Sequence, residues 1–423
     1  MNKKARSFQI YKCIFIIGNN EKLSRKFIVF SDSEGIIHFT NFHKYIKSPH
    51  QRIKSITDDG NSRFSFVVQF LNYVFFYRNI NKLNQIKAED VKTFIKSYGL
   101  CELPDDDEET HRNKETVKRC ANYLFDFIEI FTREQKNNCS INVNDLYRWD
   151  THRNKYGKVE RIRVPDFDIY FRDSSKKIFR DIPNKAFNML FSHIVQNHTE
   201  LLGLVMLSAF AGLRPSEACN CRREDSPLGA GIHFDIVNGE LWKITIDLRK
   251  EYNLRSDLVS VGNIKKERLQ SVPEVFLQAF RDSYNIYTSY ISGCKYEAEY
   301  GPFTVNSQGK AMTYTRYWQL FREIIKNEMI PMYLASDDPE IVMYGRILLD
   351  YNLSPHVFRH WYTVQLVLSG VNDPGVLMHL RGDKSPESAI TYLNEKSELA
   401  KKYQKCNSES FDYLLWAGGK KND

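Results

Sequence analysis

The pattern of hydrophobic and polar positions changes along the chain from strand-like to helical. In residues 1–60, the runs FQIYKCIFII, RKFIVFS and GIIHFT are β-branched and aromatic, and the turn clusters GNN and SDSEG separate them, as is typical of strands. From Ser62 the period becomes helical: SRFSFVVQFLNYVFFYRN is apolar nearly all round, AEDVKTFIKSYG begins with acids, and NKETVKRCANYLFDFIEIFTR carries one apolar stripe. We therefore predict a β-rich N-terminal module in 1–60 and a helical domain in 61–135.

The next segment, residues 136–180, is polar and has no clear period. KNNCSINVND and DTHRNKYGKVER are typical of loops and RVPDFDIYFRDSSKK of extended chain, so we expect a linker here. We also expect the run of five acids at Asp105–Glu109 to form a solvated loop.

A second domain is expected over 181–395. Two helices, Asn184–Gln196 and Glu200–Phe210, precede a hairpin in which GIHFDIV and ELWKITIDLRK flank an Asn238-Gly239 turn. The stretch DLVSVGNIKKERLQSVPEVF predicts another hairpin, with its tip near 263–267.

The rest of the second domain is helical, with helices expected over 273–292 and 337–352 and after GPFTVNSQGKAMT. The fold class is therefore α+β: mainly helical, with small sheets. Residues 396–423 are expected to form a C-terminal tail that could dock on a neighbouring copy of the chain. Its apolar cluster consists of Phe411, Leu414, Leu415 and Trp416.

Charge and cysteine usage narrow the functional classes. The net charge of +8 permits a nucleic-acid partner, and residues 1–60 carry 11 Lys/Arg against 5 Asp/Glu. That module either contacts DNA phosphates or is a packing module with a solvated basic face. No apolar run reaches the ~20 residues needed to span a membrane, and no secretion signal is evident, so we expect a cytoplasmic protein. The eight cysteines form no CxxC pair, and we expect Cys219 and Cys221 to be reduced thiols rather than zinc ligands.

The densest candidate chemistry lies in SPHVFRHWYTVQLVLSGVNDPGVLMHLRGDKSPESAITYLN, residues 354–394. His356 and Arg359 are three residues apart, which places both on one helical face. After a break at Gly382 and a helix start at Ser385-Pro386-Glu387, the stretch ends with Tyr392. Two potential phosphate-binding cations followed by a tyrosine point to attack on a phosphodiester.

Two segments upstream add cations. In AGLRPSEACNC, Pro215 can open a helix, which presents Arg214 at a helix junction, and Glu217 could orient that guanidinium. The alternative is a surface Arg–Glu pair of little consequence. Lys265 and Lys266 project from the tip of the second predicted hairpin.

With these residues in place, 180–395 resembles the catalytic domain of the tyrosine recombinases, the phage-integrase family. AGLRPSEA resembles the first-arginine box of that family, HVFRHWYTVQLVLSG its His-x-x-Arg-His box, and VLMHLRGDKSPESAITYL the segment that ends in the nucleophile. GIHFDIV to SVPEV resembles the sheet that carries the catalytic lysine, TVNSQGKAMT the extended piece after it, and the helices of 61–135 the core-binding domain.

The resemblance implies that Tyr392 attacks DNA to form a covalent 3′-phosphotyrosine. Tyrosine has a pKa of ~10 and is a poor nucleophile at pH 7, so it needs a base or a strongly positive site. Arg214 and Arg359 would bind the charge that accumulates on the non-bridging oxygens, because a guanidinium binds bidentately.

The remaining roles follow from the same resemblance. Lys265, or alternatively Lys266, would give the departing 5′ oxygen its proton, and His356 would act as a base or hydrogen-bond donor near the tyrosine. The covalent intermediate conserves the bond energy, so neither a cofactor nor a metal is required.

One residue departs from the family pattern. After the glycine of VLMHLRG the family usually has a second His, or Trp, whereas this chain has Asp383. Asp383 would remove a donor and repel the phosphate, unless it pairs with Arg359 or His356 or helps to take the tyrosine proton. His379 and Lys384 are alternative donors.

We therefore expect a site-specific recombinase or integrase of a mobile genetic element. Its partners would be double-stranded DNA, other copies of the chain (a dimer per site and a homo-tetramer in all) and accessory DNA-bending or directionality proteins, with association to the nucleoid if the host is bacterial. The alternatives are a type IB topoisomerase or telomere resolvase, and a catalytically impaired DNA-binding regulator on the same fold.

Overall fold

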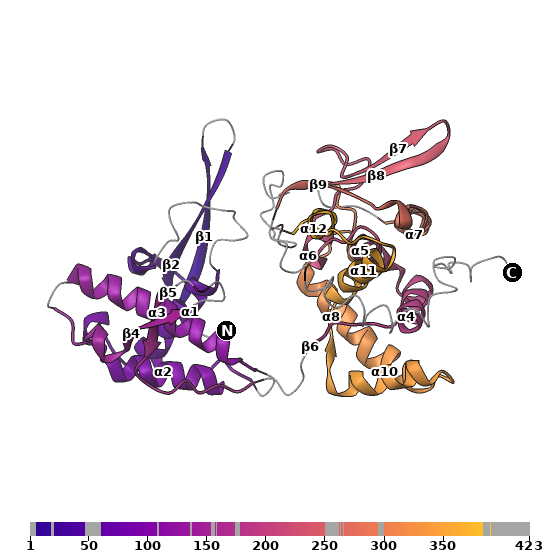
Figure 1. The fold of residues 1–423 in the computed structure, drawn as a ribbon. Coiled ribbons are helices and arrows are strands. Elements are labelled where there is room, and N and C mark those ends of the chain that lie inside the picture. The colour runs from indigo at the N-terminus through magenta and orange to yellow at the C-terminus, as the bar shows by residue number, and fades with distance from the viewer. Residues whose placement is uncertain are drawn as a thin grey trace. The chain divides into compact units, whose positions relative to one another are not determined.

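The chain divides into two compact units, residues 1–175 and 176–423. The computed structural model (Figure 1) describes the following residues: 6–17, 21–46, 61–107, 110–135, 138–153, 157, 159–173, 178–249, 262, 264, 266–294, 300–383 and 390. Within this part of the chain, none of the helices is long and apolar enough to cross a membrane.

Unit 1 begins with the predicted strands and continues with the predicted helices. The strands are antiparallel in the order β1-β2-β3, and α1 continues into a π-helical turn, η3 (Tyr73–Tyr77). The apolar stripe predicted for the third helix is buried: Val117, Ala121, Leu124, Ile128 and Phe131. The bounds are β1 (Ser7–Ile17), β2 (Glu21–Ser31), β3 (Ile37–Phe39), α1 (Asn61–Asn72), α2 (Ala88–Leu100) and α3 (Lys114–Gln135).

The N-terminal strands share one hydrophobic core with these helices. Phe8 and Ile28 pack in the same cluster as Phe70 of α1. The Phe8 amide donates to Asn72 Oδ1 at 2.7 Å, and Asn72 Nδ2 donates to the Phe8 carbonyl at 3.1 Å. The hairpin β1–β2 thus rises from the helices on an anchored base (Figure 1), and removing residues 1–60 would expose the core of unit 1.

The loop prediction for DTHRNKYGKVER is wrong. This region forms a hairpin, β4 (Tyr147–Arg153) with β5 (Val159–Pro165). Its side chains are mostly exposed, so the sequence shows no apolar alternation that would reveal the strands. The hairpin is held to α3 by an ion pair between Arg163 and Asp126 at 2.8 Å.

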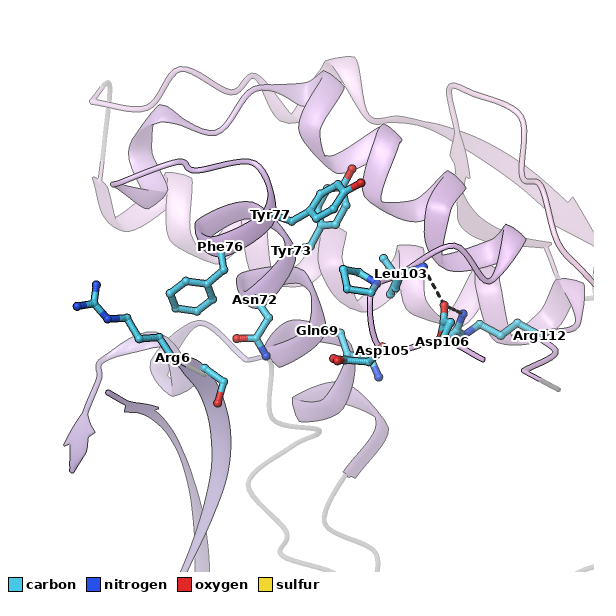
Figure 2. Close-up of a pocket in the computed structure, with 12 residues that line it drawn as sticks. Arg6, Gln69, Asn72, Tyr73, Phe76, Tyr77, Leu103, Asp105, Asp106 and Arg112 are labelled. Carbon is cyan, nitrogen blue, oxygen red and sulfur yellow. Dashed lines mark hydrogen bonds and ion pairs between the residues drawn. The ribbon is translucent and has the colours of Figure 1, made fainter. Parts of the chain in front are cut away.

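The expectation of a solvated acidic loop is wrong for Asp106. Its side chain is only 6% exposed. Its Oδ2 accepts one hydrogen bond from Arg112 Nη1 at 2.6 Å and one from the Leu103 amide at 3.0 Å. The pair lies at one side of a pocket of about 370 Å³ in unit 1, and Phe76 lies at another (Figure 2). The described lining includes none of the site residues predicted from the sequence.

Unit 2 is built around α11, which is buried nearly all round and packs against α5 and α12. Trp361 of α11 stacks on Phe187 of α4, with ring centroids 3.9 Å apart, and its Nε1 donates to Asn184 Oδ1 at 2.8 Å. The helices of this unit in the described residues are α4 (Asn184–Asn197), α5 (Thr199–Ala209), α6 (Pro215–Ala218), α7 (Leu277–Ile291), α8 (Tyr314–Ile324), α9 (Ile330–Leu334), α10 (Pro339–Asp350), α11 (His356–Leu368) and α12 (Pro374–Arg381).

A three-stranded antiparallel sheet lies at the end of unit 2 away from α10 (Figure 1). The predicted Asn238-Gly239 turn is confirmed, since both residues have positive φ (52° and 84°). The last strand pairs with the second, whereas DLVSV, the first strand predicted for another hairpin, lies outside the described residues. The strands are β7 (Ile232–Val237), β8 (Glu240–Leu248) and β9 (Arg268–Ser271), and a short parallel pair joins β6 (Ile178–Phe179) to β10 (Asn352–Leu353).

Candidate active site

Two arginines far apart in the sequence meet on one carboxylate oxygen. Arg214 Nη2 donates to Asp383 Oδ1 at 2.6 Å, and Arg359 Nη2 donates to the same oxygen at 2.7 Å. Of the alternatives left open for Asp383, the structure shows pairing with Arg359, and it adds Arg214. The first-arginine box and the stretch 354–394 therefore contribute to one cluster.

Local backbone geometry presents Arg214. Gly212, at φ +66°, lies so close to Tyr362 that a Cβ would be 2.3 Å from its Cε1, which only glycine tolerates. Arg214 is the residue before α6, and Pro215 is the first residue of that helix. The Arg214 amide donates to Glu217 Oε2 at 3.1 Å, which closes this short turn.

Glu217 is fully buried and contacts two of the arginines. Its Oε1 accepts Arg214 Nη1 at 2.9 Å, and its Oε2 accepts Arg268 Nη2 at 3.0 Å. Burial raises the pKa of Glu217, but Arg268 and Arg214 outweigh that effect and hold the pKa below its ordinary value. The surface-pair interpretation of Arg214 and Glu217 is wrong, because their side chains are 15% and 0% exposed.

Arg359 reaches the cluster from the buried helix α11. Its Nη1 donates to the Gly212 carbonyl, and only 6% of the residue is exposed. Burial and the neighbouring Arg214 lower the pKa of Arg359 to about 10, although Asp383 opposes them. The guanidinium therefore stays charged near pH 7 despite its burial.

The end of α12 fixes the position of Asp383. Gly382 takes φ +62°, its amide donates to the His379 carbonyl at 2.9 Å, and the Asp383 amide donates to the Met378 carbonyl at 3.0 Å, which is a Schellman ending. Gly382 also permits a close approach, because a Cβ there would be 2.2 Å from Arg268 Nε. A side chain at this position would displace the Arg268 guanidinium from the cluster.

A further arginine completes the cluster. Arg381 Nε donates to Asp383 Oδ2 at 2.7 Å, and its Nη1 donates to Thr363 Oγ1 at 3.0 Å. Four guanidinium groups thus face two carboxylates, which leaves a formal charge of +2 in a largely buried site. A site with this charge and these donors is suited to an anion with several oxygens, such as a phosphodiester. The arginines are Arg214, Arg268, Arg359 and Arg381, and the carboxylates are Glu217 and Asp383.

The structure describes only part of the remaining predicted site. His356 is exposed at the first position of α11, one turn before Arg359, and His379 is exposed on α12. Lys266 is exposed, and its carbonyl accepts Arg268 Nη1 at 3.1 Å. Three predicted residues lie outside the described part of the chain: Lys265, Lys384 and Tyr392.

The sequence interpretation missed Arg268, Arg381 and Gln270. On β9, Arg268 and Gln270 point into the unit while Leu269 between them is 65% exposed, the reverse of the usual alternation. Gln270 Nε2 donates to the Leu380 carbonyl at 2.6 Å, which ties β9 to α12. Arg381 adjoins the glycine break, and that break was the one available signal that the backbone approaches another element there.

Comparisons with known proteins give fold similarity only. No family model matches the sequence, and a search of curated proteins finds no relative. Similar solved structures include the XerH site-specific recombinase bound to difH substrate (14% identity, 80% of this chain and 78% of that chain, TM-score 0.42). They also include the Tn1549 transposon integrase with transposon right end DNA (13%, 86% and 97%, TM-score 0.44) and a lambda integrase dimer bound to a COC′ core site (11%, 81% and 90%, TM-score 0.43). The chain is thus similar to site-specific recombinases and integrases, at identities and TM-scores too low to assign it an activity.

Proposed function

We propose that this protein cuts and rejoins double-stranded DNA through a covalent 3′-phosphotyrosine, as a site-specific recombinase or integrase. The observation that carries the proposal is the convergence of Arg214 Nη2 and Arg359 Nη2 on one oxygen, at 2.6 and 2.7 Å. Two fixed guanidiniums aimed at a single anionic oxygen are suited to the charge that develops on a phosphodiester under attack.

In the proposed reaction the Tyr392 oxygen attacks phosphorus, and the bond from phosphorus to the 5′ oxygen breaks. The departing oxygen takes a proton from Lys265, with Lys266 as the alternative donor, while the tyrosine proton passes to His356 or to water. A free 5′ hydroxyl from a second duplex then attacks the phosphotyrosine and restores the tyrosine. No oxidant, nucleotide or metal enters this balance.

The carboxylate of Asp383 lies where a phosphate oxygen would lie in this mechanism. A bound phosphodiester must displace Asp383 Oδ1 from Arg214 and Arg359, and Arg381 can retain the other oxygen, at 2.7 Å. We propose that Asp383 keeps the arginines oriented before DNA binds. This arrangement should weaken DNA binding, because the Asp383 carboxylate and the phosphate compete for the same arginines.

A covalent-adduct assay on nicked DNA tests the proposal. A nick beside the scissile phosphate lets the short fragment that carries the released 5′ hydroxyl diffuse away, which traps the intermediate. Wild type should form an adduct that survives denaturing electrophoresis, and Tyr392→Phe should form none. Tyr403→Phe, a tyrosine outside the family register, is the matched control and should retain the adduct.

The second candidate is a catalytically impaired DNA-binding regulator. The same position of Asp383 favours it, since a carboxylate held by three arginines leaves less positive charge for a phosphate. If the wild-type protein binds its cognate DNA tightly in a mobility-shift assay yet gives no adduct on the nicked form of that site, the regulator is the correct function.

A further inference from the structure

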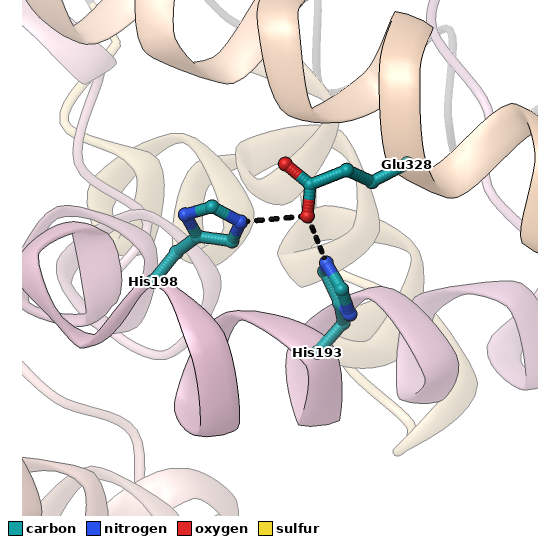
Figure 3. Close-up of side chains that lie close together, drawn as sticks. All are labelled: His193, His198 and Glu328. Atoms are coloured by element: carbon teal, nitrogen blue, oxygen red, sulfur yellow. Dashed lines mark hydrogen bonds and ion pairs between the residues drawn. The ribbon is translucent and has the colours of Figure 1, made fainter.

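A second cluster of functional side chains lies outside the arginine site. His193 Nε2 lies 2.6 Å from Glu328 Oε2, and His198 Nε2 lies 2.8 Å from the same oxygen (Figure 3). The potential ligand atoms of the three residues all lie within 4.8 Å of one another. Two imidazole nitrogens and a carboxylate oxygen form the kind of donor set that holds zinc in proteins.

Helix termini bring the two histidines together. His193 is in the last turns of α4, and His198 is both the residue after α4 and the residue before α5. The helix junction therefore aims both Nε2 atoms toward one point, although the residues are five positions apart and would not share a face of a continuous helix.

A π-helical turn brings the carboxylate to that point. Glu328 belongs to η8 (Ile325–Met329), where the Ile330 amide donates to the Ile325 carbonyl, five residues back. Pro331 follows and has no amide hydrogen, so the normal α-helical bond to the Asn327 carbonyl cannot form there. Such π turns inside helices are frequent at functional sites.

The other nitrogen of each imidazole also has a polar neighbour. Asn197 Nδ2 lies 3.1 Å from His193 Nδ1, and Glu200 Oε1 lies 3.5 Å from His198 Nδ1. Histidines that bind a metal through one nitrogen usually have such a partner on the other, because it fixes the ring and its tautomer. Asn197 Nδ2 also donates to the His193 carbonyl at 3.3 Å, so this amide would have to turn its oxygen toward Nδ1 when a metal holds Nε2.

We propose that His193 Nε2, His198 Nε2 and the Glu328 carboxylate form a zinc site. Imidazole nitrogen favours Zn²⁺ over the oxygen-preferring Mg²⁺ and Ca²⁺. The side chains are 11%, 21% and 37% exposed, so solvent can reach the site and supply a fourth, water ligand. Bound zinc would join the α4–α5 junction to a turn 130 residues later and stabilise unit 2. The proposal does not depend on the proposed function.

The test uses the full chain, stripped of metal with a chelator and kept reduced with a phosphine. Titration with ZnCl₂ in a calorimeter should give one site per chain, and zinc should raise the melting temperature, whereas MgCl₂ should not. Glu328→Gln and His198→Gln should each weaken zinc binding by roughly 100-fold or more and remove the shift. Asn197→Ala, which removes a partner of a ligand, should weaken it by about 10–100-fold. His152→Gln, an exposed histidine on β4, is the control and should behave as wild type.

A second measurement needs no variant. Zinc should protect His193 and His198 of the wild-type protein from carbethoxylation by diethyl pyrocarbonate, read by peptide mass spectrometry, and should leave His152 reactive. Absence of zinc binding would show that the trio is only hydrogen-bonded. Zinc binding that persists in Glu328→Gln and His198→Gln, with no protection of these histidines, would place the metal elsewhere, for example on thiols. Either result overturns the proposal.

Discussion

Glu217 and Asp383 are both carboxylates that bridge arginines, but they bind different nitrogens of Arg214 and differ in exposure. Glu217 has no exposed surface and binds Arg214 and Arg268 from beneath. Asp383, whose side chain is 9% exposed, accepts hydrogen bonds from Nη2 of Arg214 and Nη2 of Arg359 on one oxygen. The difference separates two tasks: the deep carboxylate positions the arginines, and the outer one holds the place of an anionic ligand.

The largest expected effect is on the stability of the fold, and it comes from replacing the fully buried carboxylate, Glu217. Glu217→Gln leaves Arg214 and Arg268 buried beside a neutral group, and breaking a buried pair in this way costs about 3–5 kcal/mol. We expect the Glu217→Gln protein to unfold at a lower denaturant concentration than wild type. Glu323→Gln, on the exposed face of α8, should leave the midpoint unchanged. An unchanged midpoint for Glu217→Gln would contradict the positioning role.

The same variant predicts a dependence on pH. Because its two arginines hold the pKa of Glu217 below the ordinary value of 4.5, this carboxylate stabilises the fold above that pH. The contribution is lost as the pH falls through the lower, folded-state pKa. The difference in unfolding free energy between wild type and Glu217→Gln should therefore shrink below pH 4.5 and be constant from pH 6 to 8.

The next effect concerns Arg359, which is bound by Asp383 and which we propose acts on the phosphate of the DNA. Arg359→Lys keeps the charge but loses the paired donors to Asp383 and to the Gly212 carbonyl. Removal of one such donor typically costs 10²–10³ in rate, so adduct formation should slow by about that factor. Arg346→Lys, on the exposed surface of α10, should retain the wild-type rate. Equal rates for both variants would remove Arg359 from the reaction.

Two smaller effects of opposite sign, on DNA affinity and on stability, test the role of Asp383. Asp383→Asn removes the competing charge, so we expect DNA binding roughly tenfold tighter, which corresponds to 1.4 kcal/mol. The same change removes the negative charge that pairs with three largely buried arginines, so it should lower the melting temperature of the DNA-free protein. Asp350→Asn, at the end of α10, should alter neither. If Asp383→Asn weakens DNA binding, the carboxylate does not hold the place of a phosphate.

The smallest effect lies in unit 1, whose charges should act on DNA only through the phosphates. Lys12 and Lys26 face each other across β1 and β2. Because the strands share the core of the helices, a double charge reversal is a cleaner test than deleting residues 1–60. Lys12→Glu with Lys26→Glu should reduce the salt dependence of DNA binding by about 2 in the log–log slope. If the slope equals that of Arg346→Glu, the basic strands serve packing alone.

The fold and two of the four arginines could be predicted from the sequence because the signals there are local. Pro215 and Gly212 mark a helix start beside Arg214, and the apolar run around Arg359 places that arginine on a buried helix. Arg268 could not be predicted, since on β9 the polar residues face inward and Leu269 faces solvent. On this strand the side chains that point inward are polar because they form the site, not a hydrophobic core.

Other features escaped prediction because they depend on distant partners. The hairpin β4–β5 has almost no apolar alternation and is fixed by the contact of Arg163 with α3. The two histidines and Glu328 meet across 130 residues and a π turn, neither of which any spacing rule reveals. Asp383 was recognisable as a departure from a pattern, but only the structure shows that three arginines hold it.

The most direct test of the central claim is to identify the residue that becomes attached to DNA. The wild-type protein, trapped on a nicked cognate site and digested with protease, should yield one nucleotide-bearing peptide, with the phosphate on Tyr392. Attachment to another residue, or a tightly bound site that yields no such peptide, would contradict the proposal that this arginine cluster serves tyrosine-mediated DNA cleavage.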